Sequence, residues 1–104
     1  MKKVFDEVLE LDKADHCSDA EATLKLVEEL GELVRAINKT NGRKLTDESQ
    51  AEISNEIGEE IADTLQNLFN VANRFGFSYD DIIKFMEKKN QSWKNKIEIR
   101  NSKK

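Results

Sequence analysis

Residues 26–37 read Leu-Val-Glu-Glu-Leu-Gly-Glu-Leu-Val-Arg-Ala-Ile, and residues 57–65 read Ile-Gly-Glu-Glu-Ile-Ala-Asp-Thr-Leu. In both stretches the apolar residues recur three and four positions apart, which is the spacing of one face of an α-helix. Carboxylates stand between them at the same spacing. The two stretches therefore predict two amphipathic helices that each carry acids beside an apolar stripe.

The rest of the chain extends this pattern to four helices. They are expected over residues 2–13, from Ser18 to about Lys39, from about Asp47 to Gly76, and from Ser78 until the helix fades after Trp93. Capping pairs are predicted at the starts of the last three, namely Ser18 with Glu21, Asp47 with Gln50, and Ser78 with Asp81. Asn41-Gly42 predicts a turn between the second helix and the third.

The connections predict how these helices pack. The short link Gly76-Phe77-Ser78 favours an antiparallel hairpin of the third and fourth helices. Gly58, inside the third helix, suggests close packing against another helix. Because one amphipathic hairpin cannot close a core alone, we expect an all-α, four-helix-bundle-like fold completed by oligomerisation. In the alternative, the first and fourth helices cover the seam within one chain.

Composition limits the class of protein. The 104 residues fit one domain, with a core over about residues 18–93 and a basic tail over 94–104. No apolar run is long enough to span a membrane or to act as a signal peptide, so we expect a cytoplasmic protein without a membrane partner. Cys17 is the only cysteine, which excludes an intrachain disulfide.

Charge is unevenly distributed along the chain. Residues 80–104 hold eight basic and four acidic residues, a net charge of +4, whereas residues 1–79 hold nine basic and 17 acidic residues, a net charge of −8. An acidic body argues against binding to a nucleic acid polymer. It suits a protein that holds cations in its body and places lysines near a small anion.

The carboxylates form two pairs at i, i+3, Glu29 with Glu32 and Glu60 with Asp63. At about 100° per residue, both pairs flank the same edge of their apolar stripes. Two helices packed along those edges would bring four carboxylates together, which is repulsive without a cation and suits Mg²⁺ with one. Three further residues are placed by the same projection: Glu56 and Asn67 lie beside the second pair, and Glu28 points outward.

The sequence lacks the residues that other kinds of catalytic or metal site would need. One acidic pair alone is most often solvated surface, but two pairs in matching positions favour a site. The single histidine, His16, lies outside both long helices, which argues against di-iron, zinc and nucleophile-triad sites. No Gly-x-x-x-x-Gly-Lys loop occurs, which excludes a P-loop.

With these motifs the sequence resembles the MazG-like, all-α nucleotide pyrophosphohydrolases, a superfamily that includes dimeric dUTPases and dCTP pyrophosphatases. The resemblance rests on residues 28–32, Glu-Glu-Leu-Gly-Glu, and residues 60–63, Glu-Ile-Ala-Asp, and covers about residues 18–93. It implies Mg²⁺, with Mn²⁺ as a substitute, on Glu29, Glu32, Glu60 and Asp63. It also implies hydrolysis of a nucleoside triphosphate to the monophosphate and pyrophosphate by a homodimer or homotetramer.

The resemblance also suggests roles for residues outside the carboxylate pairs. Glu28 would support the metal ligands from outside or assist in activating water. Lys89 and Asn90, followed by Trp93, look like the segment that reaches the substrate phosphates in relatives, although the arginine often found there is missing. His16 stands roughly where relatives place groups near the nucleobase.

Two other functions fit the same residues. One is a helical oligomerisation module without activity, which would need none of the four carboxylates. The other is a pyrophosphohydrolase of a modified nucleotide or an alarmone, which would share the metal site and differ in its pocket.

Overall fold

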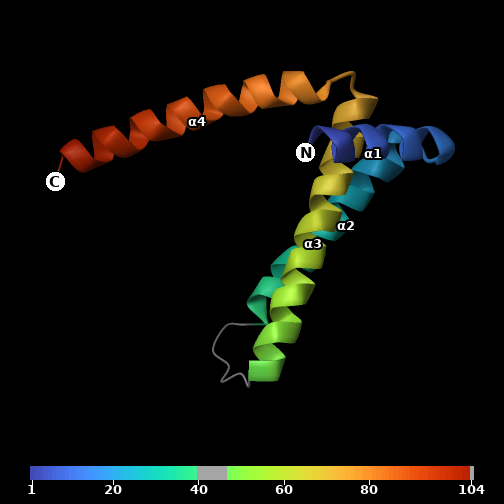
Figure 1. Cartoon of the computed structure of the whole chain (residues 1–104), viewed down its shortest axis with the longest axis horizontal. Helices are drawn as coiled ribbons and strands as arrows, with labels where there is room; N and C mark the ends of the chain where they lie inside the picture. The colour runs from blue at the N-terminus through green and yellow to red at the C-terminus, as the bar shows by residue number, and fades with distance from the viewer. Residues whose placement is uncertain (40–46, 104) are drawn as a thin grey trace.

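The computed structural model describes residues 1–39 and 47–103, and all regular structure there is helical (Figure 1). The helices are α1 (Lys2–Ala14), α2 (Asp19–Asn38), α3 (Asp47–Arg74) and α4 (Tyr79–Ser102). The all-α fold class is thus confirmed, and the first three helices lie close to their expected bounds. The predicted turn at Asn41-Gly42 lies outside the described residues, and the predicted cap depends on the side chain of Asp47, which is not described either. Within the described ranges, no helix has the length and apolar character needed to cross a membrane.

Helices α2 and α3 lie side by side as an antiparallel hairpin, and α2 turns small residues towards α3. Ala22, Glu29 and Ala36 are buried and stand seven residues apart, on one line along α2. Alanine at two of these positions lets the helix axes approach closely. The carboxylate between them is therefore carried into the seam of the hairpin.

The apolar stripes of α2 and α3 point elsewhere and remain partly exposed. They lie about 100° around each helix from the buried line. Because the two helices are antiparallel and their stripes lie on corresponding sides of the seam, the stripes share one side of the hairpin. We call this the apolar face; each member is between 37% and 63% exposed, and its members are Val27, Leu30, Val34, Ile61, Leu65 and Leu68.

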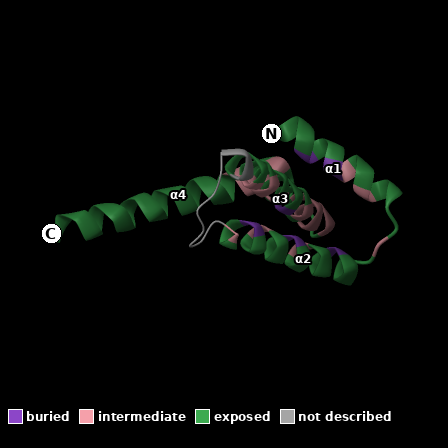
Figure 2. Cartoon of the chain, turned by 90° about the horizontal axis from the view of Figure 1, so that it is seen from below, coloured by how far each residue is buried: buried purple, intermediate pink, exposed green. Residues whose placement is uncertain are grey.

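Helix α1 packs across α3 near the start of α4. Phe5 and Val8 are buried, and the Phe5 ring lies 5.0 Å from that of Phe69 in α3 and 5.7 Å from that of Tyr79 in α4. Figure 2 shows the buried residues on the sides where α1, α2 and α3 meet, whereas α4 is exposed along its visible length. The aromatic part of the core thus lies at one end of the hairpin.

Arg74, in the last turn of α3, ties this end together. Its Nη2 lies 2.7 Å from Oδ1 of Asp12 in α1, and its Nη1 lies 3.1 Å from Oδ1 of Asp19 in α2. It also donates to the carbonyl oxygen of Cys17 at 3.0 Å. One guanidinium thus bridges three helices and the link between α1 and α2.

The junction of α3 and α4 follows from two local signals. Gly76 has φ +83°, and the N–H groups of Gly76 and Phe77 donate to the carbonyls of Asn73 and Ala72, which is a Schellman ending. Ser78 then caps α4 through a full capping box with Asp81. These bonds hold the pKa of Asp81 below its ordinary value. The carboxylate's contribution to the cap is therefore present at neutral pH and is lost as the pH falls through that lowered pKa.

Ser78→Ala should loosen the start of α4, because the N–H of Asp81 loses its acceptor at 3.1 Å. Removing such a cap costs about 1 kcal/mol, so amide hydrogen exchange in the first turn of α4 should accelerate about fivefold. Ser92→Ala, in the exposed middle of the same helix, is the matched control. Equal exchange in wild type and Ser78→Ala would contradict the role of the cap.

Three sequence expectations about packing and length are wrong. Helix α4 leaves the end of α3 and runs away from it rather than folding back as a hairpin (Figure 1), because its first turn packs on α1 through Tyr79. It also continues to Ser102, since nothing after Trp93 breaks a helix, so residues 94–102 belong to the helix rather than to a tail beyond it. Gly58 does not mark a close approach, since a Cβ there would meet nothing within 4 Å.

The cap of α2 is simpler than expected. The side chain of Ser18 accepts from the N–H of Glu21 at 3.1 Å, as predicted. The Glu21 carboxylate, however, accepts from the Ser18 hydroxyl at 3.2 Å. The second bond of the box thus joins two side chains.

Candidate functional site

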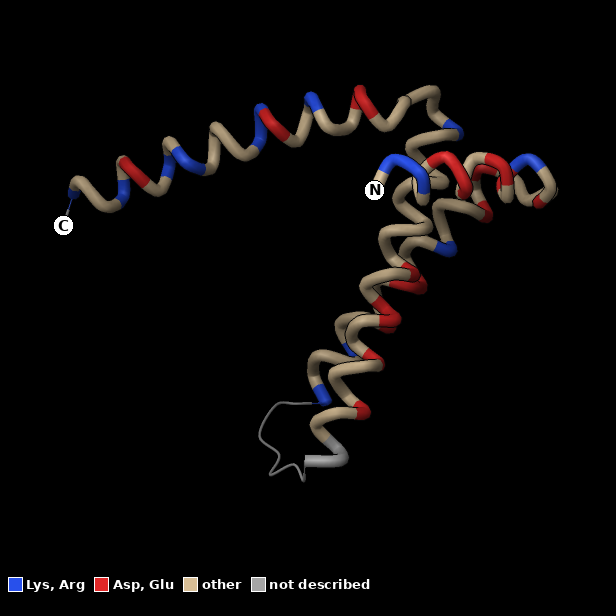
Figure 3. The backbone as a smooth tube through the Cα atoms, viewed as in Figure 1, with Lys and Arg blue, Asp and Glu red and all other residues tan. Residues whose placement is uncertain are grey.

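Three carboxylates meet in the seam between α2 and α3. An oxygen of each of Glu29, Glu60 and Asp63 lies within 4.8 Å of the other two, and we call these residues the acidic cluster. Glu29 is buried, Glu60 is partly buried and Asp63 is exposed, so the cluster opens to solvent on one side. Figure 3 shows acidic residues along the edge of the hairpin that lies away from α4.

Burial and mutual repulsion both act on the cluster. The pKa of Glu60 is raised above its ordinary value, first by burial and then by the negative charges of Glu32, Asp63 and Glu29. Glu32, the fourth predicted ligand, is exposed and close enough to contribute to this shift, but it stands outside the cluster itself.

Lys25 supplies a compensating positive charge. Its Nζ lies 3.0 Å from Oε1 of Glu29, one turn further along α2, and this contact raises the pKa of Lys25. Sequence reasoning did not single out Lys25, although its i, i+4 spacing to Glu29 was available as a signal. Because the cluster holds three carboxylates, the positive charge of this one lysine does not neutralise it.

Two oxygen atoms of the cluster lack any partner. Within the described part of the chain, Oε2 of Glu29 and Oε2 of Glu60 are buried and accept no hydrogen bond. Buried carboxylate oxygens are normally satisfied, so two such atoms side by side indicate a missing positive partner. An all-oxygen, all-carboxylate donor set is the kind that Mg²⁺ and Mn²⁺ prefer, and the residues therefore fit the cation.

The neighbouring polar residues hold the cluster or are engaged elsewhere. Asn67 donates to the backbone carbonyl of Asp63 at 2.7 Å, and Thr64 donates to that of Glu60 at 2.8 Å. Glu56, a candidate additional ligand, pairs instead with Lys39 across the hairpin at 2.7 Å. Glu28 is exposed on α2 and outside the cluster.

A pocket of about 390 Å³ adjoins the cluster, on the side of α1. Lys25 and Asn67, which contact members of the cluster, also line this pocket. Its remaining wall mixes apolar and polar groups from α1, the α1–α2 link, α2 and α3: Val8, Leu11, Asp12, Asp15, Cys17, Glu21, Ala22, Gln66 and Asn70. A pocket of this size and mixed lining suits a small organic ligand.

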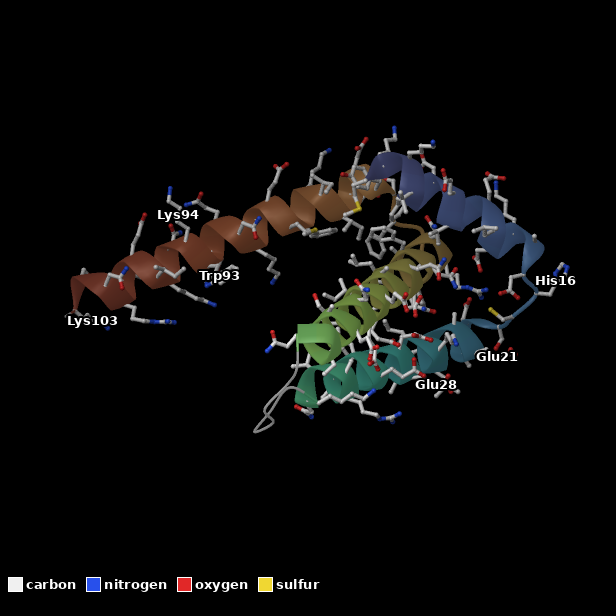
Figure 4. The ribbon with its side chains drawn as sticks, turned by 60° about the horizontal axis from the view of Figure 1, so that its bottom comes forward. His16, Glu21, Glu28, Trp93, Lys94 and Lys103 are labelled. Atoms are coloured by element: carbon white, nitrogen blue, oxygen red, sulfur yellow. The ribbon has the colours of Figure 1, made fainter. Side chains whose placement is uncertain are left out.

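The residues predicted to contact substrate are not gathered here. His16 is exposed and is not among the lining residues, although both its neighbours, Asp15 and Cys17, are. Lys89, Asn90 and Trp93 are exposed on α4, and Figure 4 shows Trp93 far from the α2 region that bears Glu28. Within one chain they do not reach the cluster, because α4 points away from it.

The fold and the cluster define a class: an all-α protein with a carboxylate-rich candidate cation site between two antiparallel helices. The family model of the MazG nucleotide pyrophosphohydrolase domain matches residues 18–97, and the chain belongs to this family. The match spans both carboxylate pairs and reaches into α4. No curated protein and no solved structure matches the chain significantly.

Proposed function

We propose that this protein hydrolyses nucleoside or deoxynucleoside triphosphates to the monophosphate and pyrophosphate in a Mg²⁺-dependent reaction. Family membership supports nucleotide pyrophosphohydrolase activity in general. The observation that carries the proposal is the acidic cluster, with two buried, unpartnered oxygens beside a pocket. Its role would be house-cleaning or control of the nucleotide pool in the cytoplasm.

Glu29, Glu60 and Asp63 would hold the cation, and Glu32 lies close enough to join them. When bound, Mg²⁺ neutralises charge on the phosphates and makes a water molecule more acidic. The helices supply the positioning: Lys25 fixes one oxygen of Glu29, and the bonds from Thr64 and Asn67 brace the α3 backbone beneath Glu60 and Asp63. Phosphoryl transfer depends mainly on such positioning and on electrostatics.

The pocket supports a place for the nucleoside part of the substrate. It lies next to the cluster, so that a nucleoside there would extend its phosphate chain towards the carboxylates. Val8, Leu11 and Ala22 offer apolar contact for a base, and the amides of Gln66 and Asn70 offer hydrogen bonds. A modified base or an alarmone would use the same phosphate site.

Pyrophosphate release from a panel of NTPs and dNTPs, with Mg²⁺ and with EDTA, tests the activity. We expect release that needs Mg²⁺ and that Glu29→Gln/Glu32→Gln lacks. Glu59→Gln, an exposed acid of α3 that lies outside the cluster, is the matched control. Failure of every common and modified nucleotide would favour the oligomerisation module instead.

Mg²⁺ should raise the melting temperature of the wild-type protein. A ligand that binds only the folded state stabilises it by RT ln(1 + [L]/Kd), about 1.4 kcal/mol when Mg²⁺ is at tenfold its Kd. For a chain of this length that is a rise of roughly 5–10 °C. Circular dichroism melts with increasing MgCl₂, with matched NaCl as the control, provide the measurement; equal melts in both salts would argue against a site formed before substrate binds.

We further propose that the active form is a homodimer or homotetramer. The exposed apolar face supports this, because scattered apolar residues are common on monomers whereas a continuous stripe on two adjacent helices marks an interface.

A further inference from the structure

Lys25 stands at the boundary between the pocket and the acidic cluster. Its Nζ lies 3.0 Å from Oε1 of Glu29, a member of the cluster, and its side chain is also part of the pocket wall. Along α2, Ala22 in the pocket wall comes first, then Lys25, then Glu29, at spacings that keep all three on one side of the helix. A ligand that extends from the pocket to the cluster therefore passes this ammonium group.

The contact with Glu29 uses only part of the ammonium group. A lysine ammonium has several N–H donors, and the hydrogen bond to one carboxylate oxygen needs a single one of them. The side chain of Lys25 is 57% exposed, whereas that of Glu29 is 7% exposed. Lys25 can therefore donate to an anion on the pocket side while it keeps its contact with the buried carboxylate.

Lys25 is also the place where the pocket wall carries positive charge. Among the lining residues in the described part of the chain, no other side chain is cationic, whereas Asp12, Asp15 and Glu21 are anionic. Of these, Asp12 is already paired with Arg74. An anionic group in the pocket would be repelled by the unpaired acids and attracted by Lys25. The wall thus favours negative charge where it meets the cluster.

We propose that Lys25 binds the α-phosphate of the nucleotide substrate while it holds Glu29, and so links the substrate to a metal ligand. With the nucleoside in the pocket, the α-phosphate is the first anionic group on the way to the cluster. The bond that is cleaved in the proposed reaction joins this phosphate to the next one. The assignment rests on the proposed function for its substrate and adds a substrate-binding residue that the protomer already holds at the site.

Titrations with a product of the proposed reaction test this contact. The ligands are AMP, GMP, CMP and UMP and their deoxy forms, each beside its nucleoside, and amide NMR shifts in the presence of Mg²⁺ give the affinities. Lys25→Gln should bind the monophosphates at least about tenfold more weakly than wild type, because a hydrogen bond from a charged donor is lost. Its affinity for the nucleosides should be unchanged, because they lack the phosphate.

Two further variants separate the charge of Lys25 from other effects. Lys25→Arg keeps the charge and should retain most of the affinity for monophosphates. Lys13→Gln is the matched control, since Lys13 is also exposed and pairs with a glutamate of its own helix, Glu10 at 3.2 Å, but is not part of the pocket wall. It should bind the monophosphates as wild type does.

Titration with MgCl₂ alone distinguishes a phosphate contact from a role confined to holding Glu29. We expect Lys25→Gln to bind Mg²⁺ at least as tightly as wild type, because a positive charge beside the cluster has been removed. The rise in melting temperature with MgCl₂ measures this affinity. Weaker Mg²⁺ binding in Lys25→Gln would show that the lysine acts through Glu29 and would overturn the proposal.

These readouts also separate the role of Lys25 from the proposed activity. Pyrophosphate release by a wild type whose monophosphate binding is absent, or is unchanged in Lys25→Gln, overturns the phosphate contact and leaves the activity standing. Weakened monophosphate binding in Lys25→Gln, together with a wild type that releases pyrophosphate from no nucleotide, supports the contact and removes the activity.

Discussion

Glu60→Gln should reduce Mg²⁺-dependent pyrophosphate release by about 100-fold or more, while the helical circular dichroism signal stays unchanged. The amide keeps the shape of the side chain but no longer offers a charged ligand beside Glu29 and Asp63. The same change should raise the melting temperature in EDTA, because burial and three neighbouring carboxylates disfavour the charge of Glu60. One substitution therefore moves activity and metal-free stability in opposite directions.

Glu59→Gln controls for the loss of one negative charge on the same turn of α3, because Glu59 is exposed. It should leave both pyrophosphate release and the EDTA melting temperature near wild type. A Glu60→Gln protein with full turnover would remove this residue from the reaction. If Glu60→Gln instead lowers the melting temperature in EDTA, the charge of Glu60 is compensated in the metal-free protein.

Arg74→Met should lower the melting temperature by roughly 5–10 °C, measured by circular dichroism. The side chains of Arg74 and Asp12 are only 10% and 15% exposed, so methionine would leave the Asp12 carboxylate nearly buried without its partner. The carbonyl of Cys17 and the carboxylate of Asp19 would lose contacts in the same step. Because Asp12 and Cys17 line the pocket, its shape should change as well.

Two further variants make the Arg74 result specific. Arg35→Met changes an exposed arginine in the last turn of α2 and should have little effect on the melting temperature. Asp12→Asn should restore part of the stability lost in Arg74→Met, since it removes the unpaired charge. An unchanged melting temperature in Arg74→Met would show that the network does not hold the helices together.

Local signals predicted the helices well and their arrangement in part. Caps at Ser18 and Ser78 and the glycine ending at Gly76 act within a few residues, so they can be read from sequence. The direction of α4 depends on the contact of Tyr79 with Phe5, 74 residues away, and no periodicity reports such a contact. The sequence does not predict the continuation of α4 past Trp93, because the helix is only weakly amphipathic.

For the candidate site too, helical spacing predicts the local placement of residues but not the contacts between helices. Helical spacing brought Glu29, Glu60 and Asp63 to corresponding edges of their helices, and the structure brings them together. Ion pairs between different helices are not predicted by helical spacing. Lys39 pairs with Glu56, and Arg74 pairs with Asp12, only once the helices have packed together. Lys89 and Asn90, which were expected to contact the substrate, lie exposed on α4, which points away from the cluster.

The carboxylates and the apolar face share α2 and α3, about 100° apart around each helix. Deleting one residue inside either helix would rotate everything beyond it by that same angle. Apolar side chains would then point into the seam, carboxylates would point outward, and the acidic cluster and the apolar face would be lost together. Substitutions along the pocket wall can therefore change which ligand the pocket accepts without disturbing the helices. Insertions and deletions are tolerated only between the helices.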